Sequence, residues 1–414
     1  MTEYLFRDDP YARTAEAVVI ASGPEGFELD RTIFYAASGG QPGDTGSFTW
    51  PGGAVGRIAD TIHPGGDRTR IVHLVAPGDA APAVGEALTL ALDWERRHRL
   101  MRMHTALHLL SVMLPYGVTG GAIGEDKGRL DFDMPEPPAD LAAVEEALNA
   151  HVAADLPVSA EWITEDELAA RPEMVRTMKV KPPVGQGRVR LVRIGAGEGT
   201  VDLQPCGGTH VARTGDIGAF KVVSEGASAS GIRRVEALTG AGALAHVAAE
   251  GAALAEAAGL LRTRPDEIPD RIRALLDERK AQAAEIAELR RRLAMAGGPA
   301  EAKGPETVGG VPFLAQTLSG VSGKDLRGLI DEHKSRLGSG VVLLVADTGG
   351  KAAVAAGVTD DLTARVSAVD LVKVAAEALG GKGGGGRPDM AQAGGTDPGR
   401  APAAIAAARA LLEA

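Results

Sequence analysis

A single cysteine, Cys206, is the strongest constraint on how this chain of 414 residues can fold. One cysteine cannot form an intramolecular disulfide, so a small fold held together by disulfides is excluded and a reducing cytoplasm is the expected compartment. Zinc fingers with several thiolates and iron–sulfur clusters ligated by cysteines are excluded as well. Any metal site must therefore take most of its ligands from the nine histidines.

The charge balance limits the class of partner. The chain has 44 Lys and Arg against 55 Asp and Glu, a formal net charge of −11. This balance argues against a generally basic nucleic-acid-binding surface but permits local basic patches. The N-terminal residues are charged where a signal peptide needs an apolar run, and the long uncharged stretch 103–124 is interrupted by His, Pro and Gly. We expect a buried helix followed by a glycine loop there, and no membrane partner.

The first part of the chain has the pattern of an α+β fold. Residues 1–95 contain short strand patterns between glycine- and proline-rich turns, which predicts a small N-terminal β-barrel. Residues 96–240 mix helices with strands that resume at 188 and recur through 235. The strands of the barrel are expected at 16–20, 32–35, 70–74 and 87–91, and the helices at 94–114, 138–155 and from Thr164, where a capping box begins.

Two further regions follow. Residues 241–300 are rich in Ala, Leu, Glu and Arg and predict a helical spacer, broken near Pro265 and Pro269. Its apolar positions favour a helical hairpin or spacer over a true coiled coil. After a glycine- and proline-rich linker, residues 301–414 predict an α/β domain. Its strands are expected at 340–346 and 352–357, its helices at 361–379 and 402–414, and a glycine-rich loop from Gly380.

Four residues are candidates for a zinc site. His104 and His108 are four residues apart on a predicted helix, so their rings project from the same face. Cys206 and His210 belong to a glycine-rich segment that can fold tightly enough to bring both side chains to one point. Together they make a set of nitrogen and sulfur ligands suited to Zn²⁺.

These motifs resemble those of a known family. The segments 104–108 (HTALH), 206–210 (CGGTH) and 38–46 (SGGQPGDTG) resemble the signature motifs of alanyl-tRNA editing domains, found in alanyl-tRNA synthetase and in free-standing AlaX proteins. Residues 231–236 match a fourth segment, and 384–395 resemble the DHHA-type domain that ends the synthetase and the long AlaX form. The sequence leaves no room before the barrel for the synthetase's own catalytic domain, so it most resembles a long AlaX protein.

The resemblance implies a function. It implies a trans-editing hydrolase that deacylates mischarged tRNA-Ala, carrying serine or glycine, by zinc-assisted ester hydrolysis. It also implies zinc binding by His104, His108, Cys206 and His210, recognition of the serine hydroxyl by Thr32, and a contact of Gln41 with the aminoacyl end. Four protein ligands close a tetrahedral zinc site, so three mechanisms are open. A fifth ligand binds the zinc, one protein side chain moves away from it, or zinc orients the substrate while water is activated elsewhere.

Two alternatives belong to other classes. A zinc-containing tRNA-binding or regulatory protein with an inactive editing site fits the same ligands. A zinc peptidase is disfavoured because residues 105–107 lack the glutamate of the His-Glu-x-x-His motif. For Thr32 and Gln41, the plain structural interpretations are a strand residue and a turn residue.

An acidic protein must bind tRNA through local clusters of basic residues. One cluster lies within 171–193, a second comprises Arg96, Arg97, Arg99 and Arg102, and a third is on the 231–236 segment. The oligomeric state stays open between a monomer and a homodimer formed through the spacer or the C-terminal domain. The candidate tRNA contacts are Arg176, Lys179, Lys181, Arg188, Arg190, Arg233, Arg234, Lys382 and Arg387.

Overall fold

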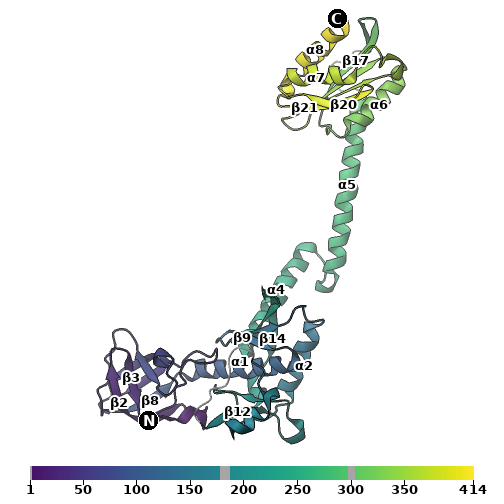
Figure 1. The fold of residues 1–414 in the computed structure, drawn as a ribbon. Coiled ribbons are helices and arrows are strands. Elements are labelled where there is room, and N and C mark those ends of the chain that lie inside the picture. Colours follow the sequence, from purple (N-terminus) through teal and green to yellow (C-terminus); the bar gives the residue numbers. More distant parts are fainter. Residues whose placement is uncertain (1, 178–186, 297–303) are drawn as a thin grey trace. The chain divides into compact units, whose positions relative to one another are not determined.

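The computed structural model describes residues 2–177, 187–296 and 304–414 (Figure 1). The chain divides into two compact units, residues 1–256 and 257–414. The first unit contains a β-barrel and an α+β core, and the second contains a mixed sheet covered by helices. The α+β class and the small N-terminal barrel are therefore confirmed, whereas the finer domain boundaries at 95, 240 and 300 stay predictions.

The N-terminal barrel is closed by six antiparallel strands in the order β2-β3-β7-β6-β5-β8. Its interior is filled by alternate strand residues such as Val19, Phe27 and Phe48, as expected for strands with one buried face. The strands are β2 (Thr14–Gly23), β3 (Gly26–Leu29), β5 (Gly46–Thr49), β6 (Val55–Ile62), β7 (Val72–Val75) and β8 (Ala87–Leu92).

The strand predicted at 32–35 is wrong beyond its first residue. Strand β4 (Arg31–Thr32) ends at Thr32 and pairs in parallel with β1 (Glu3–Tyr4). Residues 33–36 are all buried in succession, which the alternating pattern of a half-exposed strand does not allow. Ile33 and Phe34 pack in the apolar cluster of the barrel, and Tyr35 and Ala36 pack with Phe6 and Ile71.

Helix α1 (Trp94–Met113) crosses from the barrel into the core, and Asp93 caps its first turn. Arg97 on this helix is fully buried and forms an ion pair with Asp44 of the barrel loop. Its Nη2 also donates to the Ile33 carbonyl at 2.8 Å. The prediction that Arg97 contacts phosphate is therefore wrong, because its guanidinium joins the helix to the barrel. The neighbouring Arg96 and Arg99 both pair with Glu125.

The core holds two antiparallel sheets. The larger has the order β14-β15-β10-β9 and the smaller β11-β12-β13. The helix predicted at 164 is confirmed as α3 (Glu165–Ala169), with both hydrogen bonds of the capping box present. The glycine loop expected near residue 120 is instead a strand. The remaining elements are β9 (Val118–Ala122), β10 (Lys127–Asp133), α2 (Leu141–Ala153), β11 (Val158–Thr164), β12 (Arg188–Ile194), β13 (Asp202–Pro205), β14 (Phe220–Ala229) and β15 (Ile232–Thr239).

The predicted spacer is helical. Helix α4 (Gly240–Leu261) is followed by a short 3-10 turn and by α5 (Ile268–Ala296). Among the described parts of the chain, α4 alone has the length and apolar composition of a membrane span. Only 6% of its most apolar stretch is buried. The same composition occurs in helices of proteins that do not enter a membrane. The linker residues 297–303 lie outside the described residues.

The C-terminal sheet has the order β16-β17-β18-β19-β21-β20 and contains one parallel pair, β17 with β18. The sheet contributes to two apolar clusters. Helix α6 packs on β18 and β19 in one of them, and α7 and α8 belong to the other. The elements are β16 (Glu306–Val308), β17 (Val311–Ser319), α6 (Leu326–Leu337), β18 (Val341–Asp347), β19 (Ala352–Val358), α7 (Ala368–Ala378), β20 (Gly384–Arg387), β21 (Met390–Gly395) and α8 (Ala401–Glu413).

Two predictions for this domain are wrong. The glycine-rich segment after Gly380 is not a loop, because β20 and β21 form an antiparallel hairpin. In this hairpin Gly384 pairs with Ala393 at the open end and Arg387 pairs with Met390 at the turn. Glycine has a low strand propensity, so only backbone hydrogen bonds to the neighbouring strand define this pairing. The preceding helix begins at Ala368 rather than 361, since residues 360–362 form a 3-10 turn.

Candidate metal centre

Four side chains converge at the junction of α1 with the loop after β13. His104, His108, Cys206 and His210 each offer one ligand atom, and all four atoms lie within 4.8 Å of one another. The Cys206 Sγ lies 3.5 Å from His104 Nε2 and 3.3 Å from His210 Nε2. Zinc bond lengths of about 2.0–2.3 Å in a tetrahedral site would put neighbouring ligand atoms about 3.3–3.8 Å apart. These two distances fit that spacing.

Each of the three histidine rings has a second partner at Nδ1. When Nδ1 carries the proton and donates it, Nε2 keeps its lone pair for a metal, which is the usual arrangement around zinc. The three pairs are His104 with Gln41 Oε1 (2.9 Å), His108 with Asp202 Oδ2 (3.1 Å) and His210 with Thr105 Oγ1 (3.1 Å).

The electrostatics of the cluster suit a cation. Burial raises the pKa of the Cys206 thiol, but the adjacent His104 and His210 outweigh burial and hold that pKa well below its usual range. Burial lowers the pKa of His108, but hydrogen bonds with Asp202 and Cys206 outweigh it and raise this pKa to about 9. Metal binding near neutral pH must therefore displace a proton from His108.

Gly208 permits the close approach of the loop to α1. A Cβ at this position would lie 2.3 Å from His104 Cε1 and 2.7 Å from Gln41 Oε1. A Cβ at the adjacent Gly207 would meet no atom within 4 Å. The loop is also held from outside, because Arg190 Nη1 donates to the carbonyls of Cys206 and Gly208, both at 3.0 Å.

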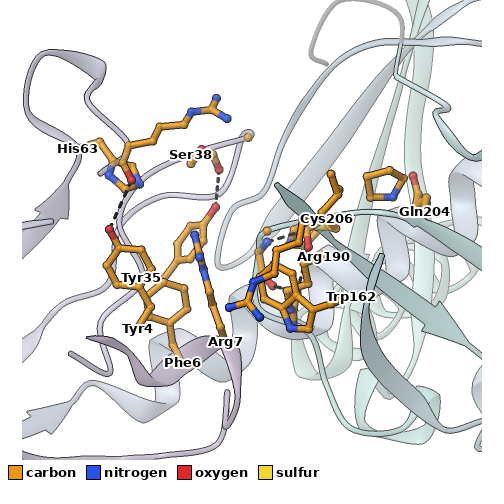
Figure 2. A pocket seen from close by; sticks show the side chains of 18 of the residues that line it. Tyr4, Phe6, Arg7, Tyr35, Ser38, His63, Trp162, Arg190, Gln204 and Cys206 are labelled. Atoms are coloured by element: carbon orange, nitrogen blue, oxygen red, sulfur yellow. Dashed lines mark hydrogen bonds between the residues drawn. The ribbon is translucent and has the colours of Figure 1, made fainter. Parts of the chain in front are cut away.

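A cleft of about 220 Å³ borders the cluster (Figure 2). Tyr4 and Tyr35 lie on one wall, and Trp162, Arg190 and Cys206 face them from the other. His104 and His108 also line it, so the presumed ligands are accessible from this side.

Thr32 and Gln41 do not line this cleft. Thr32 is completely buried, and its hydroxyl donates to His73 Nε2 at 2.8 Å and accepts from the Phe34 amide at 3.1 Å. Gln41 is 2% exposed, and its side chain is shared between His104 and Thr209. The structure thus places Gln41 against a presumed metal ligand and Thr32 in the barrel interior.

The candidate tRNA contacts fall into different surroundings. Arg188 stacks on Trp162 and Arg190 lies beside the cluster, so these two line the cleft. The Arg176 Nε lies 3.5 Å from the Asp202 Oδ1. The other three arginines each form an ion pair: Arg233 with Glu225, Arg234 with Asp131, and Arg387 with Asp389. Lys382 is exposed. Lys179 and Lys181 lie outside the described residues.

Sequence reasoning missed several residues of the site. Asp202 is one, although a signal existed: Asp202, Gln204 and Cys206 alternate along and just after β13, so they share one face. Tyr4 and Trp162 were missed because nothing in the sequence connects the N-terminal strand and β11 with the histidine motif.

Comparison with known proteins gives two domain matches. The Threonyl and Alanyl tRNA synthetase second additional domain matches residues 189–236, and the DHHA1 domain matches residues 310–414. The first match covers β12 to β15 and includes Cys206 and His210. The C-terminal domain is therefore of the DHHA type.

Similar whole proteins are alanine–tRNA ligases. That of Dinoroseobacter shibae is 47% identical over 96% of this chain and 46% of its own length, and that of Ruegeria pomeroyi 46% over 95% and 46%. The C-Ala domain of Aquifex aeolicus alanyl-tRNA synthetase is 29% identical over 27% of this chain and all of that structure, with a TM-score of 0.26. The chain spans about half the length of the ligases it matches. It is related to alanyl-tRNA synthetases.

Proposed function

We propose that this protein is a cytoplasmic hydrolase that deacylates tRNA-Ala mischarged with serine or glycine, acting in trans on tRNA charged elsewhere. The observation that carries the proposal is the convergence of three imidazoles and one thiol beside an open cleft. Among the described residues, the cleft wall bears arginines and no carboxylate, so it suits the anionic end of an RNA. The match to the second additional domain of threonyl and alanyl tRNA synthetases supports the same substrate class.

The four residues fit zinc in ligand type, ligand number and spacing, and each histidine has the outer hydrogen bond that metal-binding imidazoles need. When bound, zinc would supply positive charge that polarises the ester carbonyl or holds the substrate's amino group. The protein's own part is to present that ester. Arg190 fixes the loop carbonyls of Cys206 and Gly208, and the Gly208 amide lies 3.4 Å from the Cys206 Sγ.

Limited discrimination between alanine and serine explains why a separate hydrolytic site is needed. A pocket built for alanine rejects an added hydroxyl by only about 100-fold, so a separate site must remove serine that was attached wrongly. We assign this selection to Thr32 as the candidate reader of the hydroxyl, although Thr32 lies in the barrel interior and does not line the cleft. Since Thr32 donates to His73 and accepts from the Phe34 amide, only one lone pair of its oxygen is left, and it can meet a substrate only as an acceptor unless a partner is displaced.

The test is release of labelled serine from Ser-tRNA-Ala added to the purified chain. We expect hydrolysis that is lost with a chelator and restored by zinc, while Ala-tRNA-Ala is spared. Cys206→Ala should lose both zinc and activity, whereas Gly207→Ala, which meets no atom, serves as the matched control. A metal-free variant with full activity would overturn the role of zinc.

The same experiment distinguishes the hydrolase from the alternative, a tRNA-binding or regulatory protein. Binding of tRNA-Ala by the zinc-loaded chain without release of serine would make it a tRNA-binding or regulatory protein. Loss of binding in Arg188→Gln, with a smaller dependence of affinity on salt, would place a phosphate contact in the cleft. The paired Arg233 provides a comparison, since Glu225 already neutralises its charge.

A further inference from the structure

The barrel loop, residues 33–44, is a short projection with a well-defined turn at its tip. In this turn Ser38 and Gln41 each donate the backbone amide to the other's carbonyl at 3.0 Å. The two glycines between them have φ of +59° and +86°, the left-handed conformations that a tight turn of this kind requires. The Tyr35 hydroxyl donates to the Ser38 carbonyl at 2.9 Å and braces the turn (Figure 2). The loop therefore presents Gln41, the last residue of the turn, from a defined backbone.

Arg97 fastens the base of the barrel loop to helix α1. Its Nε donates to both carboxylate oxygens of Asp44 at 2.9 Å, and its Nη2 donates to the Ile33 carbonyl at 2.8 Å. The Asp44 Oδ2 also accepts from the Tyr35 amide at 2.6 Å. The side chains of Arg97 and Asp44 are 0% and 1% exposed. One buried guanidinium thus contacts the first and the last residue of the loop.

A buried ion pair of this kind is better suited to orientation than to stability. Its net contribution to stability is small, because the cost of removing two charges from water offsets their attraction. Charge-assisted hydrogen bonds that engage both oxygens of a carboxylate, in contrast, fix the geometry of the two partners closely. The contact between Arg97 and Asp44 therefore sets the position of the loop on α1.

The spacing along helix and loop connects this pair with the metal centre. Arg97 and His104 are seven residues apart on α1, so they project from the same face two turns, or about 10 Å, apart. Asp44 and Gln41 are three residues apart on the loop, and three residues of extended chain also span about 10 Å. With Asp44 seated on Arg97, Gln41 reaches His104, and its Oε1 lies 2.9 Å from the Nδ1 of that imidazole.

We propose that Arg97 and Asp44 are positioning residues of the metal centre. Their ion pair fixes the place where Gln41 meets His104, and so holds this imidazole in the orientation and tautomer that leave Nε2 for zinc. The barrel thereby raises zinc affinity, although none of the four presumed ligands belongs to it. The inference rests on zinc binding in the proposed function and does not depend on hydrolysis.

The test is a double-mutant cycle on zinc affinity, measured by competition with a chromophoric chelator at a temperature where every variant is folded. Arg97→Lys keeps the charge but loses the planar fork, and it should weaken zinc binding about 10-fold. In a chain that already carries Gln41→Leu, the same change should have no further effect, because Arg97 acts through Gln41. Equal losses with and without Gln41 would overturn the inference, since a residue that only stabilises the fold acts independently of Gln41.

Two further variants separate positioning from stability. Phe48→Leu is the matched control: Phe48 is completely buried in the barrel and packs on Phe27 and Trp50, so its truncation should lower barrel stability and leave zinc affinity unchanged. Arg96→Gln serves where Arg97→Lys prevents folding, because Arg96 is partly exposed and its Nη1 donates to the Gly43 carbonyl of the same loop at 2.6 Å. It should weaken zinc binding less, and again only when Gln41 is present. A loss in Phe48→Leu as large as that in Arg97→Lys would contradict a positioning role.

The hydrogen bond to His104 is measured separately in the metal-free chain, by NMR with histidine labelled with nitrogen-15. The proton on Nδ1 of His104 should be protected from exchange with water, and Arg97→Lys should make it exchange faster than Phe48→Leu does. Unchanged exchange in Arg97→Lys would overturn the inference. Failure of the unmodified chain to bind zinc would remove the proposed function, and the exchange rates would still decide whether Arg97 positions His104 through Gln41.

Discussion

The Oε1 of Gln41 lies 2.9 Å from Nδ1 of His104, so a residue of the barrel loop orients a presumed metal ligand of the core. The Thr209 amide also donates to this Oε1 at 3.1 Å, and the Gln41 Nε2 donates to the Thr209 hydroxyl at 2.9 Å. Gln41 therefore links the glycine-rich barrel loop, helix α1 and the cysteine-containing loop. Both the oxygen and the nitrogen of its amide are therefore hydrogen-bonded within the protein.

Gln41→Leu should weaken zinc binding about 10–100-fold, as loss of an outer hydrogen bond to a ligand does in other metal sites. Gln41→Glu keeps the acceptor for His104 and should lose less. Competition with a chromophoric chelator measures both affinities. Unchanged zinc affinity together with slower serine release would instead show that Gln41 acts on the aminoacyl end, as the family resemblance implies.

Gly208→Ala should abolish zinc binding or reduce it strongly, because the added methyl group would lie within 2.3–2.7 Å of atoms of His104 and Gln41. The loop would have to move away from α1, which separates Cys206 and His210 from the histidine pair. Gly207→Ala has open space and should bind zinc normally. Bound zinc per chain, measured by atomic spectroscopy, decides between them; equal zinc content in the two variants would contradict the close approach of the loop to the helix.

The sequence predicted the parts of the fold whose side chains follow a regular period. Alternating apolar residues marked three of the six barrel strands, β2, β7 and β8, and the capping box at Thr164 marked the start of α3. Strands β3, β5 and β6 were not predicted. The β20–β21 hairpin escaped because Gly384–Gly386 have no side chains to form a pattern. The four presumed ligands were found because two motifs each placed a pair close together in sequence.

The rest of the site depends on contacts between distant segments. Arg97 has the sequence context of a basic cluster, and only its burial against Asp44 reveals a structural role. Thr32 was chosen from a family motif, yet its hydroxyl is bonded to His73, 41 residues away. No local pattern predicts either pairing.

Thr32→Val should reduce the stability of the barrel by about 1–3 kcal/mol, because it leaves His73 Nε2 and the Phe34 amide buried without a partner. Thr32→Ser retains the hydroxyl and should cost less. Urea unfolding gives the stability of each variant. Serine release from Ser-tRNA-Ala and alanine release from Ala-tRNA-Ala then test recognition: a selective loss on the seryl substrate supports a reading role, and an equal loss on both contradicts it.

His73 predicts a dependence of barrel stability on pH. Its complete burial lowers its pKa from 6.5 to about 4, against the smaller opposing effect of the hydrogen bond to the Phe27 carbonyl. The unfolded chain therefore binds this proton first as pH falls. The stabilisation from neutral His73 is complete above about pH 6.5 and is lost between 6.5 and 4, to a limit of about 3 kcal/mol.

His73→Gln cannot titrate, so its stability should fall less steeply than that of the unmodified protein between pH 6.5 and 4. Urea unfolding followed by Trp50, with Trp94 and Trp162 replaced by Phe, reports on the barrel because Trp50 packs against Phe48. His246→Gln removes a partly exposed histidine of α4 and should keep the steep profile. Parallel profiles for the His73 variant and the unmodified protein would show that His73 is not held neutral by burial, since only a group that titrates differently in the folded and unfolded states changes the slope.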